Sequence, residues 1–256
     1  MAAEKNYINS VIKALAVLEC FSREVKELKL SEIARMLEMP KSTTSNLIYT
    51  LGKKGYIEQD IKTGKFRLGA KNFILGNIFE YHLNLVELTR PFMESLRDEF
   101  NETVHLSIPS GDTGICVEKT EGYNTMGMNS QVGKNFPLHC TASGKLFLSA
   151  MSPERLEKFL QSVDLFKRTE DTITQPEVLQ EAVNRVRKQG YGLAVNESEI
   201  GLTSIAAPVY NYHGELVASL SIAAPTIRIS EELRGKMIQE LLSAAKETSL
   251  KLGYIE

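Results

Sequence analysis

Six polar side chains between positions 41 and 49 are of the types that bind nucleic acid. They are Lys41, Ser42, Thr43, Ser45, Asn46 and Tyr49. Hydroxyl groups bond to phosphates or base edges, and an asparagine amide pairs bidentately with adenine. A helix that is merely solvent-exposed usually carries Glu and Lys pairs instead, so this face is suited to a major groove. By itself the pattern fits a helical hairpin with a polar outer face equally well.

Three cations follow on a second predicted element, a β-hairpin. Residues 56–68 read as two short strands joined by a turn that contains a glycine. The cations are Lys62, Lys65 and Arg67, and such side chains project where a hairpin of this kind meets a phosphate backbone. Two helices followed by a basic hairpin make a winged helix-turn-helix, so the order of elements favours binding to double-stranded DNA.

Hydrophobic spacing predicts the helices that would hold these side chains in place. One face of residues 30–37 is apolar at helical spacing, and Ser31 is placed to cap that helix. Pro40 then starts a second helix, because its fixed φ suits a first turn. The buried stripe of the second helix is Leu47, Ile48 and Leu51. The strongly apolar segment 8–21 predicts a first helix that packs beneath these two and completes their core.

A second group of small residues could form a ligand site. In the segment 137–145, the run Ala142, Ser143 and Gly144 would let backbone amides at a helix start approach an anion closely. Small hydroxyl residues also recur in two clusters, 203–208 and 219–225, on neighbouring predicted strands, where an ordinary core would carry Val and Leu. These segments predict a cavity, although the first of them also fits an ordinary capped helix start.

Catalytic and metal-binding chemistry has weaker support. The sequence contains no nucleophile elbow, phosphate-binding loop, paired zinc-protease histidines or Cys-x-x-Cys pair. His105, Cys116, His139 and Cys140 could bind zinc if the fold united them, but adjacent ligands lack the usual zinc spacing. We therefore expect no cofactor and no catalytic residue. The alternative is an enzyme or metal-binding module whose N-terminal domain serves assembly.

Composition and charge fit a two-domain protein. The 256 residues carry a net charge of −2, but residues 1–69 hold 12 Lys and Arg against 8 Asp and Glu, so the remaining residues carry a net charge of −6. The positive field therefore lies on the segment with the helix-turn-helix. Three widely spaced cysteines indicate a reducing compartment, and no apolar run could span a bilayer. We expect a cytoplasmic protein with no membrane partner.

The predicted organisation is α+β. A winged helix-turn-helix occupies residues 1–69, a linker helix residues 70–85, and a domain of mixed strands and helices residues 86–256. The linker helix carries an apolar stripe, which is Phe73, Ile74, Ile78 and Phe79. Because that stripe needs a partner surface, we expect the helix to pair with a second subunit; simple packing on its own domain is the alternative.

Almost the whole chain resembles the IclR-type (isocitrate-lyase regulator) family of bacterial transcription regulators. The resemblance is carried by the helix-turn-helix 30–51, the wing 55–69, the loop 137–145 and the ordered motifs of 190–225. It implies a homodimer or a dimer of dimers, an N-terminal domain that binds operator DNA, and a GAF-like domain that binds a small metabolite, often an organic or aromatic acid.

The resemblance also implies which residues contact that metabolite. They are Ala142, Ser143, Ala194, Ser204, Ser221 and Ala223. Relatives often carry an acidic group where this chain has Ala194 and a hydroxyl where it has Ala223, which implies a ligand with a more apolar body than glyoxylate or pyruvate. Asn46 stands where an arginine is common, so the operator sequence of relatives should not be transferred. We expect a repressor whose effector changes the spacing between the two DNA-binding domains of a dimer.

Overall fold

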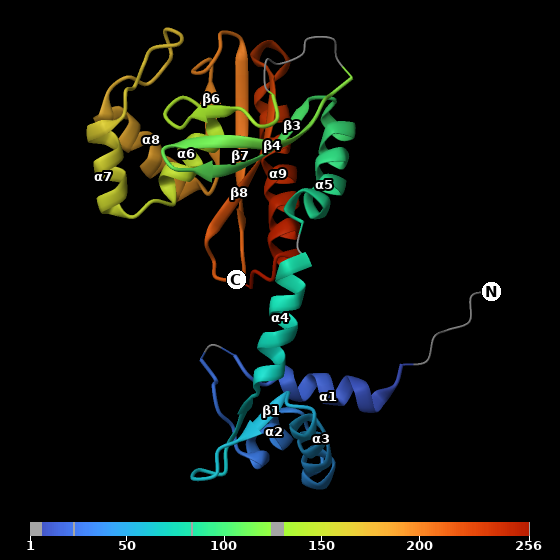
Figure 1. Cartoon of the computed structure of the whole chain (residues 1–256). Helices are drawn as coiled ribbons and strands as arrows, with labels where there is room; N and C mark the ends of the chain where they lie inside the picture. The colour runs from blue at the N-terminus through green and yellow to red at the C-terminus, as the bar shows by residue number, and fades with distance from the viewer. Residues whose placement is uncertain (1–6, 23, 83, 124–130, 256) are drawn as a thin grey trace, which may run out of the picture. The chain divides into compact units, whose positions relative to one another are not determined.

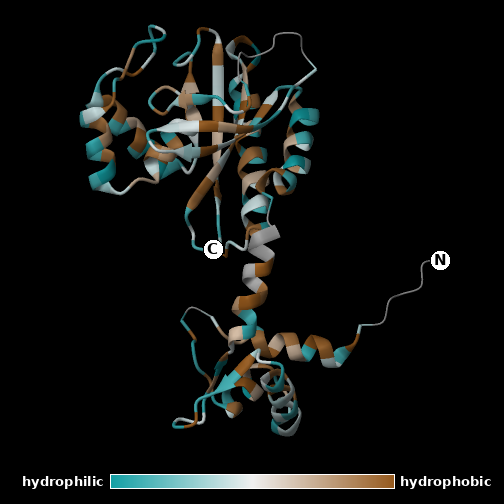
Figure 2. Ribbon diagram, in the orientation of Figure 1, coloured by the Kyte–Doolittle hydropathy of each residue, from teal (hydrophilic) through white to brown (hydrophobic). Residues whose placement is uncertain are grey.

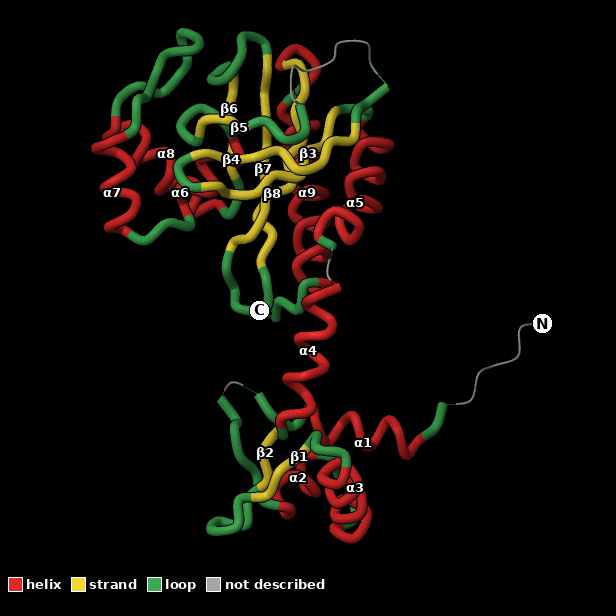
Figure 3. The backbone as a smooth tube through the Cα atoms, in the orientation of Figure 1, coloured by secondary structure: helices red, strands yellow, loops and turns green. Residues whose placement is uncertain are grey.

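The computed structural model describes residues 7–22, 24–82, 84–123 and 131–255. Within the helix Ala70–His82 (α4), the side chains at 76, 77 and 79–82 are not described. The chain forms two compact units, Met1–Leu83 and Asn84–Glu256. Figure 1 shows the elements of each unit, and Figure 3 separates their helices, strands and loops. The division falls just before Asn84, whose side chain accepts hydrogen bonds from the backbone amides of Val86 and Glu87 and so caps the first helix of the second unit.

The first unit is a small helical domain with a hairpin. Its elements are α1 (Asn9–Glu19), α2 (Leu30–Met36), α3 (Lys41–Lys53), β1 (Ile57–Gln59), β2 (Phe66–Leu68) and α4 (Ala70–His82). The strands β1 and β2 are antiparallel, and Leu28 adds a bridge to Phe66 on the outer side. Val17, Ile33 and Ile48 are buried together where α1, α2 and α3 meet. The predicted helix-turn-helix and wing are therefore confirmed as elements.

The caps of the two central helices differ from the prediction. Helix α2 begins at Leu30, so Ser31 lies inside its first turn and is not the N-cap. The carboxylate of Glu32 accepts the backbone N–H of Lys29 at 2.6 Å instead. Glu32 is thus placed as in half of a capping box, and the predicted role of Ser31 was wrong. Pro40 is the N-cap of α3, one residue before the first turn in which it was expected, with a φ of −56° that suits a helix start and a ψ of 138° that is not helical.

Helix α1 packs on the core of the first unit, as expected, but through only part of its apolar surface. Val17 is fully buried, but the exposed fractions of Ile8, Val11 and Leu15 are 67%, 51% and 53%. Figure 2 shows that much of α1 is hydrophobic. Helix α4 is similar, with Phe73 at 75% and Ile78 at 52% exposed. The side chain of the fourth predicted stripe residue, Phe79, lies outside the described residues.

The second unit is a six-stranded antiparallel sheet between two layers of helices. The strand order is β5-β4-β3-β8-β7-β6. The strands are β3 (Thr103–Ser110), β4 (Thr113–Thr120), β5 (Asn135–Pro137), β6 (Gly192–Val195), β7 (Leu202–Tyr210) and β8 (Leu216–Pro225). The helices are α5 (Leu85–Phe100), α6 (Ala142–Ser149), α7 (Pro153–Ser162), α8 (Pro176–Gln189) and α9 (Glu231–Lys251), with a 3-10 turn at Thr226–Arg228. The mixed α and β architecture predicted from the sequence is confirmed.

The two helical layers cover opposite faces of this sheet (Figure 1). Helices α5 and α9 pack on one face, and α6 packs on the other together with α8 and α7. These three helices share an apolar core that includes Phe147 of α6, Leu156 of α7 and Leu179 of α8. The edge strand β5 was not predicted, because a three-residue strand carries no usable alternation. Among the described residues, no helix is both long and apolar enough to cross a membrane.

Candidate nucleic-acid interface and ligand cavity

The outer face of α3 presents the polar residues predicted for DNA contact. Lys41, Ser42, Ser45 and Asn46 are exposed, and Tyr49 is 66% exposed. Thr43 is half-buried at the rim of the same face. The neighbouring Thr44 points inward, where its hydroxyl donates to the carbonyl of Pro40 at 3.1 Å. Helical periodicity thus leaves a continuous polar face that a groove of DNA can approach.

The three predicted cations of the hairpin differ in exposure and in ion pairing. Lys62 and Arg67 are exposed, whereas Lys65 is half-buried. The turn is held by Asp60, whose carboxylate accepts the backbone N–H groups of Lys62 and Thr63 at 2.8 and 2.7 Å, and these donors lower the pKa of Asp60. Arg67 lies 3.4 Å from Glu58, an exposed ion pair. Lys62 is therefore the cation at the turn, and Arg67 shares its charge with a carboxylate.

A cavity of about 150 Å³ lies in the second unit, between the sheet and the start of α6. Its lining residues are His105, Ser107, Cys116, Phe136, Thr141, Ala142, Ser143, Ser198, Leu202, Ser204, Ser221 and Ala223. Strand register explains why distant residues converge there. His105 lies opposite Ser221, and Ala223 lies opposite Ser204. Neighbouring strands therefore place hydroxyl, imidazole and methyl groups side by side on one face.

Five of the six residues indicated by the family resemblance line this cavity, and Ala194 does not. Ala194 is paired with Ser204, and it packs with Ala142 and Ala206 in a small buried cluster. Gly192 is needed close by, because a β-carbon there would lie 2.2 Å from the carbonyl oxygen of Ala142. The strand β6 can thus lie directly against the first turn of α6, and Ala194 packs beside the cavity without facing it.

The described lining of the cavity carries no charged group at neutral pH. Burial lowers the pKa of His105 to about 4, so its imidazole is neutral. Burial also raises the pKa of the Cys116 thiol, which stays protonated. The hydroxyl of Thr141 accepts the N–H of Gly144 and donates to the carbonyl of Pro137. A ligand would therefore meet neutral hydrogen-bonding groups and a few apolar surfaces.

The four residues considered as zinc ligands lie in different environments. His105 and Cys116 line the cavity, whereas His139 packs edge-on against Phe166 and its Nε2 lies 3.1 Å from the carbonyl of that residue. Cys140 is buried, and burial raises its pKa to about 11. Within the described ranges, no group of three or more His, Cys, Asp or Glu side chains is arranged to hold a metal ion.

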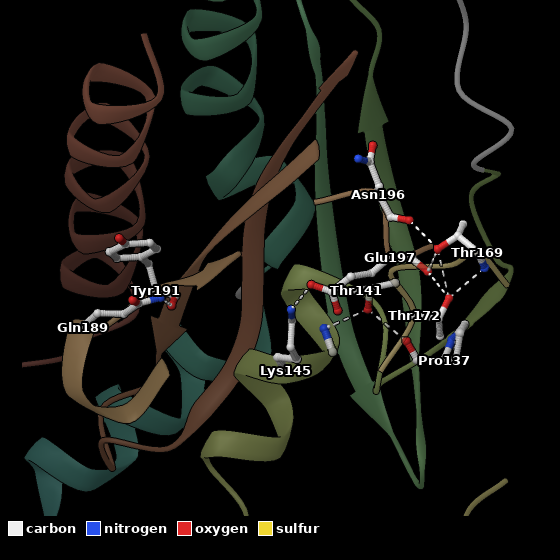
Figure 4. A network of polar contacts seen from close by, with 10 residues as sticks. Pro137, Thr141, Lys145, Thr169, Thr172, Gln189, Tyr191, Asn196 and Glu197 are labelled. Atoms are coloured by element: carbon white, nitrogen blue, oxygen red, sulfur yellow. Dashed lines mark hydrogen bonds and ion pairs between the residues drawn. The ribbon is translucent and has the colours of Figure 1, made fainter. Parts of the chain in front are cut away.

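A buried ion pair joins α6 to the segment that follows β6 (Figure 4). Lys145 Nζ lies 2.6 Å from Glu197 Oε1, and the two side chains are 4% and 12% exposed. Burial lowers the pKa of Lys145 and raises that of Glu197, while their mutual attraction opposes both shifts. The hydroxyls of Thr169 and Thr172 donate to the main-chain carbonyls of residues 196 and 197 at 2.6 and 2.7 Å. Ser198, which lines the cavity, is therefore attached to a firmly held segment.

Sequence reasoning missed several lining residues. Ser107 and Ser198 were not singled out, and His105 and Cys116 were considered as zinc ligands. One signal was available for the strand residues, since His105 and Ser107 alternate along β3 as Ser219 and Ser221 do along β8. Ser198 lies in a loop, where periodicity provides no information.

Two family models match the chain. The model described as the IclR helix-turn-helix domain matches residues 10–60, and the model described as the bacterial transcriptional regulator IclR C-terminal matches residues 80–250. Together they include α3 in the first unit and the cavity lining in the second. The match of the C-terminal model alone covers more than half of the chain.

Relatives with similar sequences span nearly the full length. The HTH-type transcriptional regulator KdgR of Escherichia coli is 32% identical over 96% of this chain and 94% of its own. The HTH-type transcriptional regulator XynR of Escherichia coli is 31% identical over 96% and 98%. The transcriptional repressor IclR of the same organism is 29% identical over 96% and 90%.

Solved structures agree with these relatives. A putative IclR transcriptional regulator from Silicibacter sp. has a TM-score of 0.87 at 25% identity, covering 97% of both chains. Thermotoga maritima IclR has a TM-score of 0.65 at 29% identity, covering 97% of this chain and 100% of its own. These proteins are transcription regulators, so the alternative interpretation of the chain as an enzyme is set aside. With both domain models matched in order, the chain belongs to the IclR family of DNA-binding bacterial transcription regulators.

Proposed function

We propose that this regulator is a repressor that releases its operator when a small organic acid enters the cavity between the sheet and α6. The observation that carries the proposal is the composition of the cavity. Side chains from β3, β7 and β8 meet the start of α6 around a cavity whose lining is rich in small hydroxyl residues. Such a site is concave and has few polar anchors, as ligand sites commonly are.

DNA recognition is assigned to α3 and the hairpin of the first unit. Ser42, Ser45 and Asn46 would contact base edges and phosphates in the major groove, and Lys62 would contact the backbone. A homodimer is proposed because α1 and α4 leave large apolar side chains exposed, among them Leu15 and Phe73. Two-fold pairing would place two reading helices about 34 Å apart, the separation of successive major grooves on one face of DNA.

The test begins with an operator selected by the purified full-length protein from random duplex DNA. Binding is measured by fluorescence anisotropy with and without a panel of small organic acids. We expect at least one acid to weaken operator binding, and Ser221→Leu, which fills the cavity, to abolish that response. Ser162→Leu, at an exposed position outside the lining, is the matched control. Sequence-selective binding that no acid changes would contradict the effector assignment, and the absence of selective binding would contradict DNA recognition.

The sign of regulation and the oligomeric state need separate measurements. A reporter fused to the selected operator should be more active in cells that lack this regulator, because a repressor blocks transcription when bound. Sedimentation of the full-length protein should give the mass of a dimer or of a dimer of dimers. Phe73→Ser should shift that equilibrium toward monomer if α4 contributes to pairing. A monomer that binds two half-sites as tightly as the parent would contradict the dimer proposal.

A further inference from the structure

A second recess adjoins the cavity of the second unit. It has a volume of about 360 Å³, and it shares Cys116, Phe136, Thr141, Ser198 and Leu202 with the lining of the cavity. The two spaces therefore adjoin along these shared residues. We call this second space the outer recess.

The outer recess differs from the cavity in its charge. Among the described residues, Arg168 and Lys134 line it, together with one carboxylate, that of Glu199. The described lining of the cavity contains no Lys, Arg, Asp or Glu. A ligand that occupied both spaces would thus meet neutral groups in the cavity and an excess of one positive charge in the outer recess.

Arg168 is held in place at this recess. Its Nε donates to the carbonyl of Ser198 at 2.9 Å, and its guanidinium carbon lies 5.8 Å from the centre of the Phe166 ring. Ser198 belongs to both linings, so this hydrogen bond fixes the guanidinium next to the cavity. Among the described residues, no ion pair is formed by Arg168. The terminal nitrogens of the guanidinium can therefore donate to an anion.

Lys134 is on a second segment of the same recess. Its carbonyl accepts the backbone N–H of Cys116 at 3.3 Å, which ties the segment to β4. The side chain is exposed and forms no ion pair within the part of the chain that the structure describes. The two cations thus come from separate segments that are both anchored beside the cavity.

We propose that the outer recess is an anion subsite, in which Arg168 with the help of Lys134 binds the carboxylate of the effector while a neutral body occupies the cavity. This inference rests on the proposed function and deepens it. The placement follows from solvation, because a carboxylate that leaves water for the uncharged lining of the cavity would lose hydration without gaining a cationic partner, whereas the recess supplies Arg168 and Lys134. At the recess, a guanidinium can form two charge-assisted hydrogen bonds with it. The effector is therefore an acid whose carboxylate is separated from its body, and not an acid that fits wholly within the cavity.

The experiment compares acids with their neutral counterparts on the full-length protein. Benzoate, 3-phenylpropionate and 4-phenylbutyrate are each paired with the corresponding primary amide, which preserves the shape and removes the charge. Affinities are measured by calorimetry, and each variant is first shown to melt like the parent. At least one acid should bind the parent about tenfold tighter than its amide, the size expected of hydrogen bonds to a charged group.

Four variants test the assignment. Arg168→Gln should remove the preference for the acid and leave amide binding unchanged, while Arg168→Lys should keep part of the preference. Glu199→Gln should strengthen acid binding, because it removes the carboxylate from the recess. Lys167→Gln is the matched control, since it makes the same charge change one residue away at a side chain that is paired with Glu170 and does not line the recess.

Three results would overturn the inference. The first is equal affinity of the parent for acids and amides, which includes no binding of either. The second is an equal effect of Arg168→Gln and Lys167→Gln on acid binding. The third is operator release by a neutral compound with full potency. The last of these would leave effector control of operator binding standing, so failure of the anion subsite is distinguishable from failure of the proposed function.

Discussion

Removing one partner of the buried Lys145–Glu197 ion pair should strongly destabilise the second unit. Lys145 Nζ lies 2.6 Å from Glu197 Oε1, and neither side chain is more than 12% exposed. Lys145→Met would leave the Glu197 carboxylate buried beneath α6 without its cation. The position of Glu197 is unfavourable for such a charge, because Oε2 is buried and has no hydrogen-bond partner among the described residues.

The magnitude follows from burial. Loss of one partner from a buried pair costs about 3–5 kcal/mol, because the remaining charge stays desolvated. Replacing both charges with apolar residues of similar size should cost far less, and we expect Lys145→Met with Glu197→Leu to lie within about 1 kcal/mol of the parent. The hydrogen bonds from Thr169 and Thr172 involve only the main chain at residues 196 and 197, so they can hold that segment in either variant.

The assay is urea unfolding of the full-length protein, followed by far-ultraviolet circular dichroism because the chain contains no tryptophan. Lys167 and Glu170 provide a matched control. They form a Lys–Glu pair at the same distance of 2.6 Å, but their side chains are 54% and 91% exposed. Lys167→Met should therefore change the free energy of unfolding by less than about 1 kcal/mol. If Lys145→Met costs no more than Lys167→Met, the reasoning from burial is refuted.

Three further predictions concern other parts of the molecule. Thr43→Ala or Asn46→Ala should weaken binding to the selected operator by about 1–3 kcal/mol and leave binding to random DNA unchanged, as measured by anisotropy. Equal losses of affinity for the operator and for random DNA would contradict base recognition. Lys62→Gln should weaken binding to all sequences and reduce the slope of log affinity against log salt by about one. Arg67→Gln should have a smaller effect, because Arg67 is paired with Glu58. Identical slopes for the parent and Lys62→Gln would exclude a phosphate contact. His105 should make stability depend on pH, because burial lowers its pKa from 6.5 to about 4. Its contribution to the free energy of unfolding is complete above about pH 6.5, and about 3 kcal/mol is lost as the pH falls toward 4. In urea titrations His105→Gln should remove this loss, and an unchanged pH profile would contradict the prediction.

The helices and strands of the first unit could be predicted from the sequence because local chemistry specifies them. Pro40 precedes α3, and Gly55 and Gly64 have positive φ where the helix ends and the hairpin turns. The polar face of α3 followed directly from helical spacing. The exact caps were less predictable, since Ser31 and Glu32 are both plausible capping residues and only the backbone geometry decides between them.

The extent of burial could not be read from composition. The sequence showed that α1 is apolar, but the same apolar spacing fits a core-facing helix and a helix that offers its surface to a partner. The structure buries Val17 and leaves Ile8 and Leu15 exposed. This difference depends on where α2 and α3 place their own side chains, which no local pattern encodes.

By itself, the sequence determined the positions of the helices and of the longer strands, which helix face is polar and where small residues replace bulky ones. These features depend on interactions between residues close in the chain. Only the tertiary structure decided that His105 lies beside Ser221, that Ala194 packs next to the cavity without lining it, and that Arg168 is held against Ser198. Those neighbours are set by strand order, register and loop packing, which bring together residues far apart in the chain.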